Sequence, residues 1–340
     1  LVDSSKPMGA GIVGETMQFH GTASLYRLNG AESLATLYFS SREPTVYPAV
    51  TLNSVGSKGG QAASFAFDLA TSIVYTRQGN PLWAGQDRDG LPPVRSNDLF
   101  FGPSAMDPQP DWVDRSKLAI PQADEQQRFL ANLIVEMSRG RQLLPRFWYF
   151  PNGQRAVVVL TGDDHAAVST PGDVFERLDD RSPVGCSVKD WECLRMSLYV
   201  YPSTNLTDGE ASAYAAEGFE VAPHLSTNCA DFDAASLGGL LARDLGLFAN
   251  KYPSVPAPVS NRFHCVVWSD WSTAATREFE HGIRFDTNYY FWPPDWVNDT
   301  PGHFTGSAMP MRFADLDGTI IDVYQSATQL TDESGQTYPY

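Results

Sequence analysis

The pattern of apolar and polar positions changes near residue 150. Before it, short runs of branched and aromatic residues are separated by turns rich in Gly, Ser and Asn, a pattern that predicts strands. A polar stretch over 78–114, rich in Pro, Gly and Asp, predicts an extended loop. Residues 123–138 have the apolar repeat of one buried helix face, with Asp124 and Glu125 near the start, and predict a helix. The predicted strands are 34–39, 49–52 and 64–67.

From residue 155 onward, apolar runs alternate with helical stretches. Such alternation is typical of parallel strands joined by helices, and functional groups then lie at the carboxyl ends of the strands. We therefore expect an α/β fold: a distorted (β/α) barrel domain over 151–340, preceded by a smaller α/β or β-rich accessory domain over 1–150. The predicted strands are 156–160, 196–201, 219–222, 265–268, 283–285 and 319–324, and the predicted helices are 208–217, 231–250 and 272–280.

The composition narrows the classes of partner. The chain has 340 residues, of which 42% are hydrophobic and 12% aromatic, ample for a packed core. No stretch reaches the roughly 18 consecutive apolar residues that a membrane span needs. The formal net charge of −16 repels nucleic acid and anionic lipids, so neither is expected as a partner. A neutral or cationic substrate is compatible with this charge.

The cysteines indicate the compartment. The four lie in the second half and form no Cys-x-x-Cys pair, which argues against a structural zinc site. Cys186 and Cys193 flank a loop, so we expect a disulfide there, with reduced buried thiols as the alternative. The first residue is Leu1 rather than Met, which we interpret as a mature or trimmed product. The expected disulfide implies an oxidising compartment, so we expect a protein that is secreted or at the cell surface. The other two cysteines are Cys229 and Cys265.

The strongest chemical signal is the motif Thr161-Gly-Asp-Asp-His165, in which two carboxylates follow an apolar run. Successive side chains of a strand point in opposite directions, so Asp163 and Asp164 are suited to different roles. One can bind a cation while the other acts as a general base. The alternative is an ordinary polar loop.

Two further motifs follow predicted strands. His224 comes after one of them, and Asn228 stands four residues later, so a helical turn beginning at Leu225 would let both bind one ion. A single histidine is nevertheless more often structural. In the next motif, Arg262 can hold the free carboxylate through a bidentate contact, and His264 would share its side of an extended strand. Five aromatic residues between Tyr289 and Trp296 either stack on sugar rings or belong to the core.

In this order, the motifs over about 155–329 resemble the polysaccharide deacetylase family, the NodB-homology enzymes. The resemblance implies that Asp163 is the catalytic base and Asp164 a metal ligand. It also implies that His224 binds the metal, with Asn228 at the place of the family's second histidine, where the amide or a water would complete the shell. Arg262 matches the arginine of the family's third motif.

The same resemblance implies a hydrolase that removes acetyl groups from a polysaccharide containing N-acetylated hexosamine. The cofactor would be a divalent metal, with zinc favoured over nickel, cobalt or manganese. The family's terminal Leu-x-His motif, which supplies the proton donor, has no counterpart near Ile320-Ile-Asp-Val-Tyr-Gln325. His264, His303 or a water would have to take that role, and we favour His264. His165 is a possible additional ligand.

The first part is similar, more weakly, to glutamine-amidotransferase-like accessory domains. The similarity runs from Pro48-Ala-Val through Gly59-Gly to Phe65-Ala-Phe-Asp-Leu69. This stretch contains no cysteine, so it lacks the nucleophile of that chemistry. A supporting, non-catalytic role is expected.

Two other functions remain open at this point. A metal-independent glycoside hydrolase would use two carboxylates about 5–9.5 Å apart, such as Asp163 with Asp286 or Asp295. A carbohydrate-binding protein with a decayed deacetylase site is compatible with Asn228 and with the missing terminal histidine. Metal analysis separates the first from a deacetylase, and acetate release separates the second.

Overall fold

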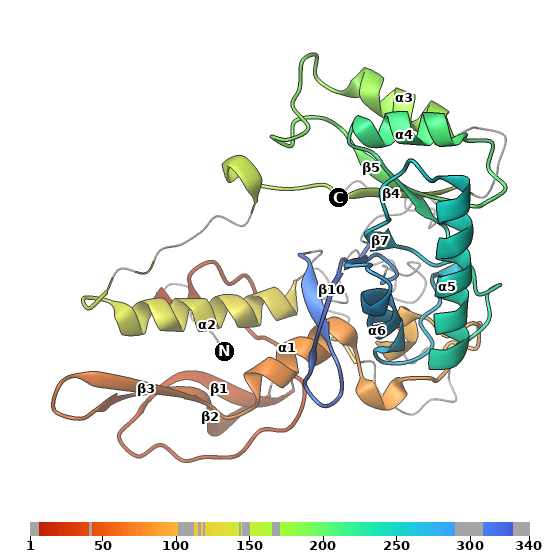
Figure 1. Cartoon of the computed structure of the whole chain (residues 1–340). Coiled ribbons are helices and arrows are strands. Elements are labelled where there is room, and N and C mark those ends of the chain that lie inside the picture. Colours follow the sequence, from red (N-terminus) through yellow and green to blue (C-terminus); the bar gives the residue numbers. More distant parts are fainter. Residues whose placement is uncertain are drawn as a thin grey trace.

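The structure is a computed structural model that describes residues 7–40, 43–100, 112–114, 117, 120–142, 144, 150–164, 171–289 and 309–328. Within these residues the fold is mixed α/β, with parallel and antiparallel sheets (Figure 1). None of the helices described is long and apolar enough to cross a membrane.

The N-terminal part is an antiparallel sheet packed on one helix. Strands β1 (Glu32–Ser40), β2 (Glu43–Val55) and β3 (Gly60–Phe65) lie in that order, and each covers or overlaps a predicted strand. The predicted helix is α2 (Gln122–Ser138), whose Phe129 and Leu133 enter the same core as strand residues such as Leu37 and Val50. The pattern therefore identified this layer correctly.

Helix α1 (Leu69–Gln78) was not predicted because its buried face is polar. Asp68 caps the helix by accepting a hydrogen bond from the Thr71 amide, and the buried side chains are polar or charged. A helix of this kind lacks the apolar period by which sequence analysis detects helices. The buried residues are Ser72, Thr76, Arg77 and Gln78.

The second part contains two sheets. Strands β4 (Leu160–Asp164), β5 (Met196–Val200) and β6 (Glu220–Pro223) are parallel and in sequence order. The other sheet has the order β7-β8-β10-β9, where only β9 is antiparallel to its neighbour. A parallel bridge between Leu225 and Phe263 lies between the two sheets. The strands of this second sheet are β7 (Ser260–Asn261), β8 (Phe285–Asp286), β9 (Met311–Ala314) and β10 (Ile320–Gln325).

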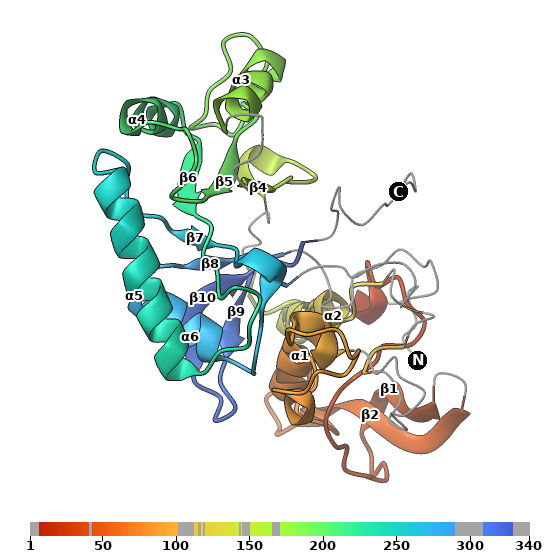
Figure 2. The ribbon, with the colours of Figure 1, turned by 90° about the vertical axis from the view of Figure 1, so that its right-hand side faces the viewer.

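The described strands therefore form a series of mostly parallel strands, and they do not establish the closed barrel expected from the sequence. Helices α3 (Pro171–Arg181), α4 (Asp208–Ala216), α5 (Ala234–Lys251) and α6 (Thr273–Glu280) pack against it (Figure 2). Helix α4 begins at a capping box of Thr207 and Glu210, which explains why its start was predictable. Helix α5 buries Leu237, Leu241 and Phe248 on its apolar face.

Two predicted strands were placed wrongly. The strand expected over 156–160 begins only at Leu160, and Val158 and Val159 are 78% and 52% exposed. The strand expected over 265–268 is interrupted by the 3-10 turn η6 (His264–Val266), where Cys265 has a φ of 63°. Helix α3 and strand β9 were not predicted.

The predicted loop over 78–114 belongs largely to the second part. Its described residues include two short 3-10 turns, η2 (Pro81–Trp83) and η3 (Ser96–Leu99). Leu99 and Phe100 are fully buried in one core with residues of α5, α6 and β10. The domain boundary at residue 150 remains a prediction, although this core draws residues from both sides of it. The remaining turns are η1 (Pro7–Gly9) and η5 (Pro151–Gly153).

Candidate active site

The candidate residues lie near the carboxyl ends of β4, β6 and β7. In the parallel register, Asp163 is level with Tyr199 and Ala222, and His224 follows β6. Arg262 directly follows β7. Parallel strands place their carboxyl ends on one edge, so motifs 40 to 100 residues apart in sequence meet there, as expected from the α/β pattern.

Asp163 and Arg262 form an ion pair. The Arg262 Nε lies 3.1 Å from the Asp163 Oδ2, and the two side chains are only 13% and 21% exposed. The contact expected from sequence is thus present, although it joins one nitrogen to one oxygen instead of forming a bidentate pair. In this geometry the guanidinium fixes the direction of the carboxylate.

The two histidines of the second and third motifs are in contact. The His224 Nε2 lies 3.3 Å from the His264 Nδ1, and the ring planes are nearly perpendicular at 83°. His224 is 4% exposed, and His264 is half-buried in the turn η6 rather than in a strand. The expectation that His264 shares an extended strand with Arg262 was therefore wrong, but its ring still reaches this cluster.

Tyr201 is a member of the cluster that sequence analysis missed. Its ring packs edge-on against both imidazoles, with centroids 4.9 Å from His224 and 5.9 Å from His264. Partial burial raises the pKa of the Tyr201 hydroxyl, and the Asp163 charge raises it further, whereas a hydrogen bond with Ser226 lowers it. Its position directly after β5, as His224 directly follows β6, was the signal that could have identified it.

Asp164 and Asn228 differ from the expected arrangement in local geometry. Asp164 is 8% exposed and is level with Val200 and Pro223, on the opposite side of β4 from Asp163. Asn228 is exposed and sits in a turn with a φ of 58°, where its backbone N–H donates to the Ser226 Oγ. The helical turn expected to begin at Leu225 is absent, because Leu225 is extended and bridges to Phe263.

Another feature of the second part is a pair of buried acidic side chains. Glu278 of α6 and Asp286 of β8 are both 0% exposed and share a hydrogen bond. The Asn261 Nδ2 donates to the Glu278 Oε1, and the backbone N–H of Asn288 donates to the Asp286 Oδ1. Burial and the Asp286 charge raise the pKa of Glu278 well above its usual value. Burial likewise raises the pKa of Asp286, to about 6.

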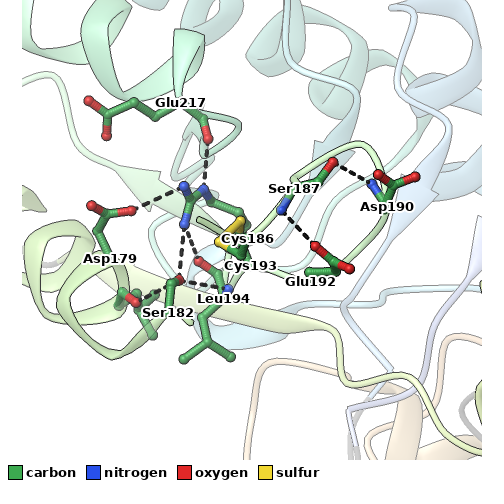
Figure 3. The surroundings of a disulfide bond; sticks show 11 residues. Asp179, Ser182, Cys186, Ser187, Asp190, Glu192, Cys193, Leu194 and Glu217 are labelled. Carbon is green, nitrogen blue, oxygen red and sulfur yellow. Dashed lines mark hydrogen bonds and ion pairs between the residues drawn. A yellow bond between two sulfur atoms is a disulfide. The ribbon is translucent and has the colours of Figure 1, made fainter. Parts of the chain in front are cut away.

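The cysteines form two disulfides. Cys186 and Cys193 are joined, as predicted, and the bond closes an exposed loop between two cysteines that are seven positions apart in sequence (Figure 3). Cys229 and Cys265 are also joined, across 36 residues, a bond that sequence analysis did not predict. This second bond links the loop after His224 to the turn that carries His264.

Two groups of three potential metal ligands occur in the described part of the chain. One contains His264 with the sulfurs of Cys229 and Cys265, whose closeness the disulfide already explains. The other contains Asp87, Asp89 and Asp98. Neither group includes Asp164 or His224, so the ligand set inferred from the family remains a prediction.

The other histidines and the aromatic cluster contribute little to this site. The His281 Nδ1 lies 2.8 Å from the Arg277 carbonyl at the end of α6, as expected for a helix cap. His20 stacks on Trp112, and burial lowers its pKa to about 4. Tyr289 is fully buried in the core, where its hydroxyl donates to the Gln78 carbonyl. His165, Asp295, His303 and residues 290–296 lie outside the described residues.

Comparisons with known proteins give one match. No family model matches the chain, and no curated protein matches it. Among solved structures, the chain is similar to a protein from Mycobacterium smegmatis described as a candidate polysaccharide deacetylase. The match has 18% identity and a TM-score of 0.28, and it covers 43% of this chain and 45% of that structure. A TM-score this low does not establish a shared fold, and no match supports the amidotransferase-like resemblance of the first part.

Proposed function

We propose that this chain is a divalent-metal-dependent hydrolase that removes acetyl groups from a polysaccharide containing N-acetylated hexosamine. The observation that carries the proposal is the Asp163–Arg262 ion pair beside two touching imidazoles at the ends of parallel strands. An oriented carboxylate next to nitrogen donors is the combination that metal-assisted hydrolysis requires.

The donor set fits a zinc ion by its chemistry. Imidazole nitrogens and a carboxylate are ordinary zinc ligands, and catalytic zinc sites commonly use three protein ligands with one open position. His224 and Asp164 are the proposed ligands, with Asn228 or a water completing the shell. A bound zinc would polarise the acetyl carbonyl and lower the pKa of its water.

The protein side chains have separate roles in the proposed reaction. Asp163 accepts the proton of the attacking water, and Arg262 keeps the carboxylate pointed at that water through the 3.1 Å contact. The leaving amine takes a proton from His264 or from a water, because an amide anion is too basic to depart. Tyr201, which packs against both imidazoles, limits their rotation.

The surroundings of Asp286 argue against a glycoside hydrolase that uses Asp163 and Asp286 as its two carboxylates. Its carboxylate is fully buried and bonded to Asn288 and Glu278, so it has no access to a substrate. The two disulfides are compatible with an extracellular protein, and we propose that the enzyme is secreted or held at the cell surface.

The test is acetate release from N-acetylglucosamine and N-acetylgalactosamine oligomers by the full chain. We expect release that stops with a chelator and returns with zinc. Release that a chelator does not affect contradicts metal dependence. New reducing ends without acetate identify a glycoside hydrolase, and sugar binding without either product identifies a binding protein.

A further inference from the structure

The facing nitrogens of His224 and His264 have the separation of two ligands on one metal. Two imidazole nitrogens, each about 2.0–2.1 Å from a tetrahedral zinc ion, lie about 3.3–3.4 Å apart. The separation of the His224 Nε2 and the His264 Nδ1 is 3.3 Å. This separation matches the edge of the tetrahedron, and it is also within the range of a hydrogen bond between the two rings.

The positions of the rings are held from several sides. The His264 amide donates to the Leu225 carbonyl at 2.7 Å, which ties η6 to the residue after His224. Arg95 donates through its Nε to the Cys265 carbonyl at 2.9 Å. The Cys229–Cys265 disulfide joins the same two segments covalently. A pair of ligands held in this way loses little conformational entropy when an ion binds.

The backbone around the disulfide is in unusual conformations. Asn228, Cys229, Cys265 and Val266 all have positive φ values, between 46° and 63°. Such conformations are unfavourable in non-glycine residues and persist only where the surroundings impose them. Their concentration at the two ends of one disulfide places the strain beside the imidazole pair.

Asn228 does not occupy the position that a second imidazole would need. It is exposed, and its backbone turns away from a helical path through the 58° φ. His264 instead approaches His224 from the turn η6, 40 residues farther along the chain.

We propose that His264, rather than Asn228, is the second imidazole ligand of a divalent metal that His224 also binds. The inference rests on the metal dependence of the proposed function and replaces the proton-donor role for His264. The remaining ligand positions are filled by Asp164 or by water, and a water becomes the proton donor to the leaving amine.

The test measures zinc affinity of the full chain directly, by competition with a chromophoric chelator, and does not depend on activity. The wild-type chain should bind one zinc. His264→Ala and His224→Ala should each weaken binding by more than the roughly 10–100-fold that loss of an outer hydrogen-bond partner costs. Asn228→Ala, which removes the alternative ligand, should lose far less affinity than His264→Ala. The matched control His281→Ala, which removes a histidine at the end of α6, should bind zinc like the wild type.

A second variant and an absorption spectrum distinguish the loss of a metal ligand from misfolding. His264→Cys keeps a zinc ligand at the same position and should recover most of the affinity that His264→Ala loses. Cobalt-loaded wild type should show the absorption of a four-coordinate site, and His264→Cys should add a sulfur-to-cobalt charge-transfer band. That band appears only if residue 264 touches the metal.

Each outcome decides the inference. Unchanged zinc affinity in His264→Ala overturns it, and unchanged affinity with lost acetate release returns His264 to the role of proton donor. A wild-type chain that binds no zinc also overturns it. Zinc binding that requires both histidines, without acetate release from any oligomer, supports the inference while the proposed deacetylase function fails.

Discussion

At the scale of single residues, the candidate site depends on which way adjacent side chains point. Asp163 faces Arg262, whereas Asp164 is level with Val200 on the other side of β4. The alternation of side chains along a strand thus gives two neighbouring carboxylates different surroundings. A difference in surroundings is what allows one acid to act as a base while its neighbour binds a cation.

Exchanging Asp163 for Asn should separate the two roles. The carboxamide keeps the size of the side chain but cannot accept the proton of the attacking water. We expect zinc affinity to stay near that of the wild type and acetate release to fall by at least about 100-fold, the usual contribution of a general base. In Asp164→Asn, zinc binding itself should weaken. Loss of zinc in Asp163→Asn with retention in Asp164→Asn would mean that the roles are reversed.

The buried acid pair makes stability depend on pH. Because the pKa of Glu278 is raised in the folded chain, the folded state holds a proton that the unfolded state releases above about pH 4.5. The stability that this proton provides is complete below that pH and is lost as the pH rises through the raised pKa. Glu278→Gln carries no titrating proton, so its free energy of unfolding should fall less steeply with rising pH.

Urea denaturation at a series of pH values from 4 to 8 measures this slope. Glu280→Gln is the matched control, since Glu280 lies two residues away in the same helix and pairs with Arg277 at the surface. The control should keep the wild-type slope. Equal slopes for wild type and Glu278→Gln would show that the pair does not hold an extra proton.

At the scale of elements, one loop and one short turn carry the imidazole pair. The loop after β6 and the turn η6 contain little regular structure. The Cys229–Cys265 disulfide and the Leu225–Phe263 bridge supply the missing constraints. A cross-link between two loops lowers the entropy of the unfolded chain in proportion to the logarithm of the enclosed length.

The two disulfides should therefore differ in their effects. Replacing both Cys229 and Cys265 with Ser should cost about 4 kcal/mol of unfolding free energy, against about 2 kcal/mol for Cys186 and Cys193, because their loops differ in length. The first double variant should also lose zinc affinity, whereas the second should keep it, since the Cys186–Cys193 bond does not join the segments that carry the histidines.

Thiol counting in denaturant, without a reductant, is the accompanying measurement. All four cysteines are paired, so no free thiol should react before reduction and four should react afterwards. Four reactive thiols before reduction would rule out both bonds. Equal zinc affinities for the two double variants would show that the second disulfide does not position the imidazoles.

At the scale of the whole molecule, the first 150 residues and the rest share a core and buried hydrogen bonds. Residues of α1 reach across to the last strands. The Arg77 Nε donates to the Gln325 Oε1 at 3.1 Å, and Gln78 exchanges two hydrogen bonds with the Ala314 backbone. Leu99 fills a position in the core of the second part. These contacts couple the two parts in folding.

A fragment of residues 151–340 should consequently be much less stable than the full chain. It lacks Leu99 and Phe100, and it exposes the polar groups that Arg77 and Gln78 satisfy. In the full chain, Leu99→Ala alone should cost about 2–5 kcal/mol, as removal of a buried leucine side chain usually does. Thermal unfolding followed by circular dichroism compares the proteins. A fragment with the melting temperature of the full chain would support an independent domain beginning at 151.

The sequence by itself determined the elements whose signals are local. The apolar repeat of α2, the capping box of α4 and the strand β5 are encoded within a few residues, so pattern analysis located them. The disulfide between Cys186 and Cys193 was predictable for the same reason, because few residues separate the bonded cysteines. The contact of Asp163 with Arg262 was also predictable, since parallel strands bring their carboxyl ends together.

Tertiary structure alone decided the features that depend on distant residues. Helix α1 buries polar side chains whose partners lie about 50 to 250 residues away, so no local pattern reveals it. The left-handed Cys265 breaks the strand expected at 265–268 and turns His264 toward His224. The Glu278–Asp286 pair forms only where α6 packs against β8. In each case the free energy that stabilises the feature comes from burial and from long-range contacts, and a local sequence pattern contains no information on either.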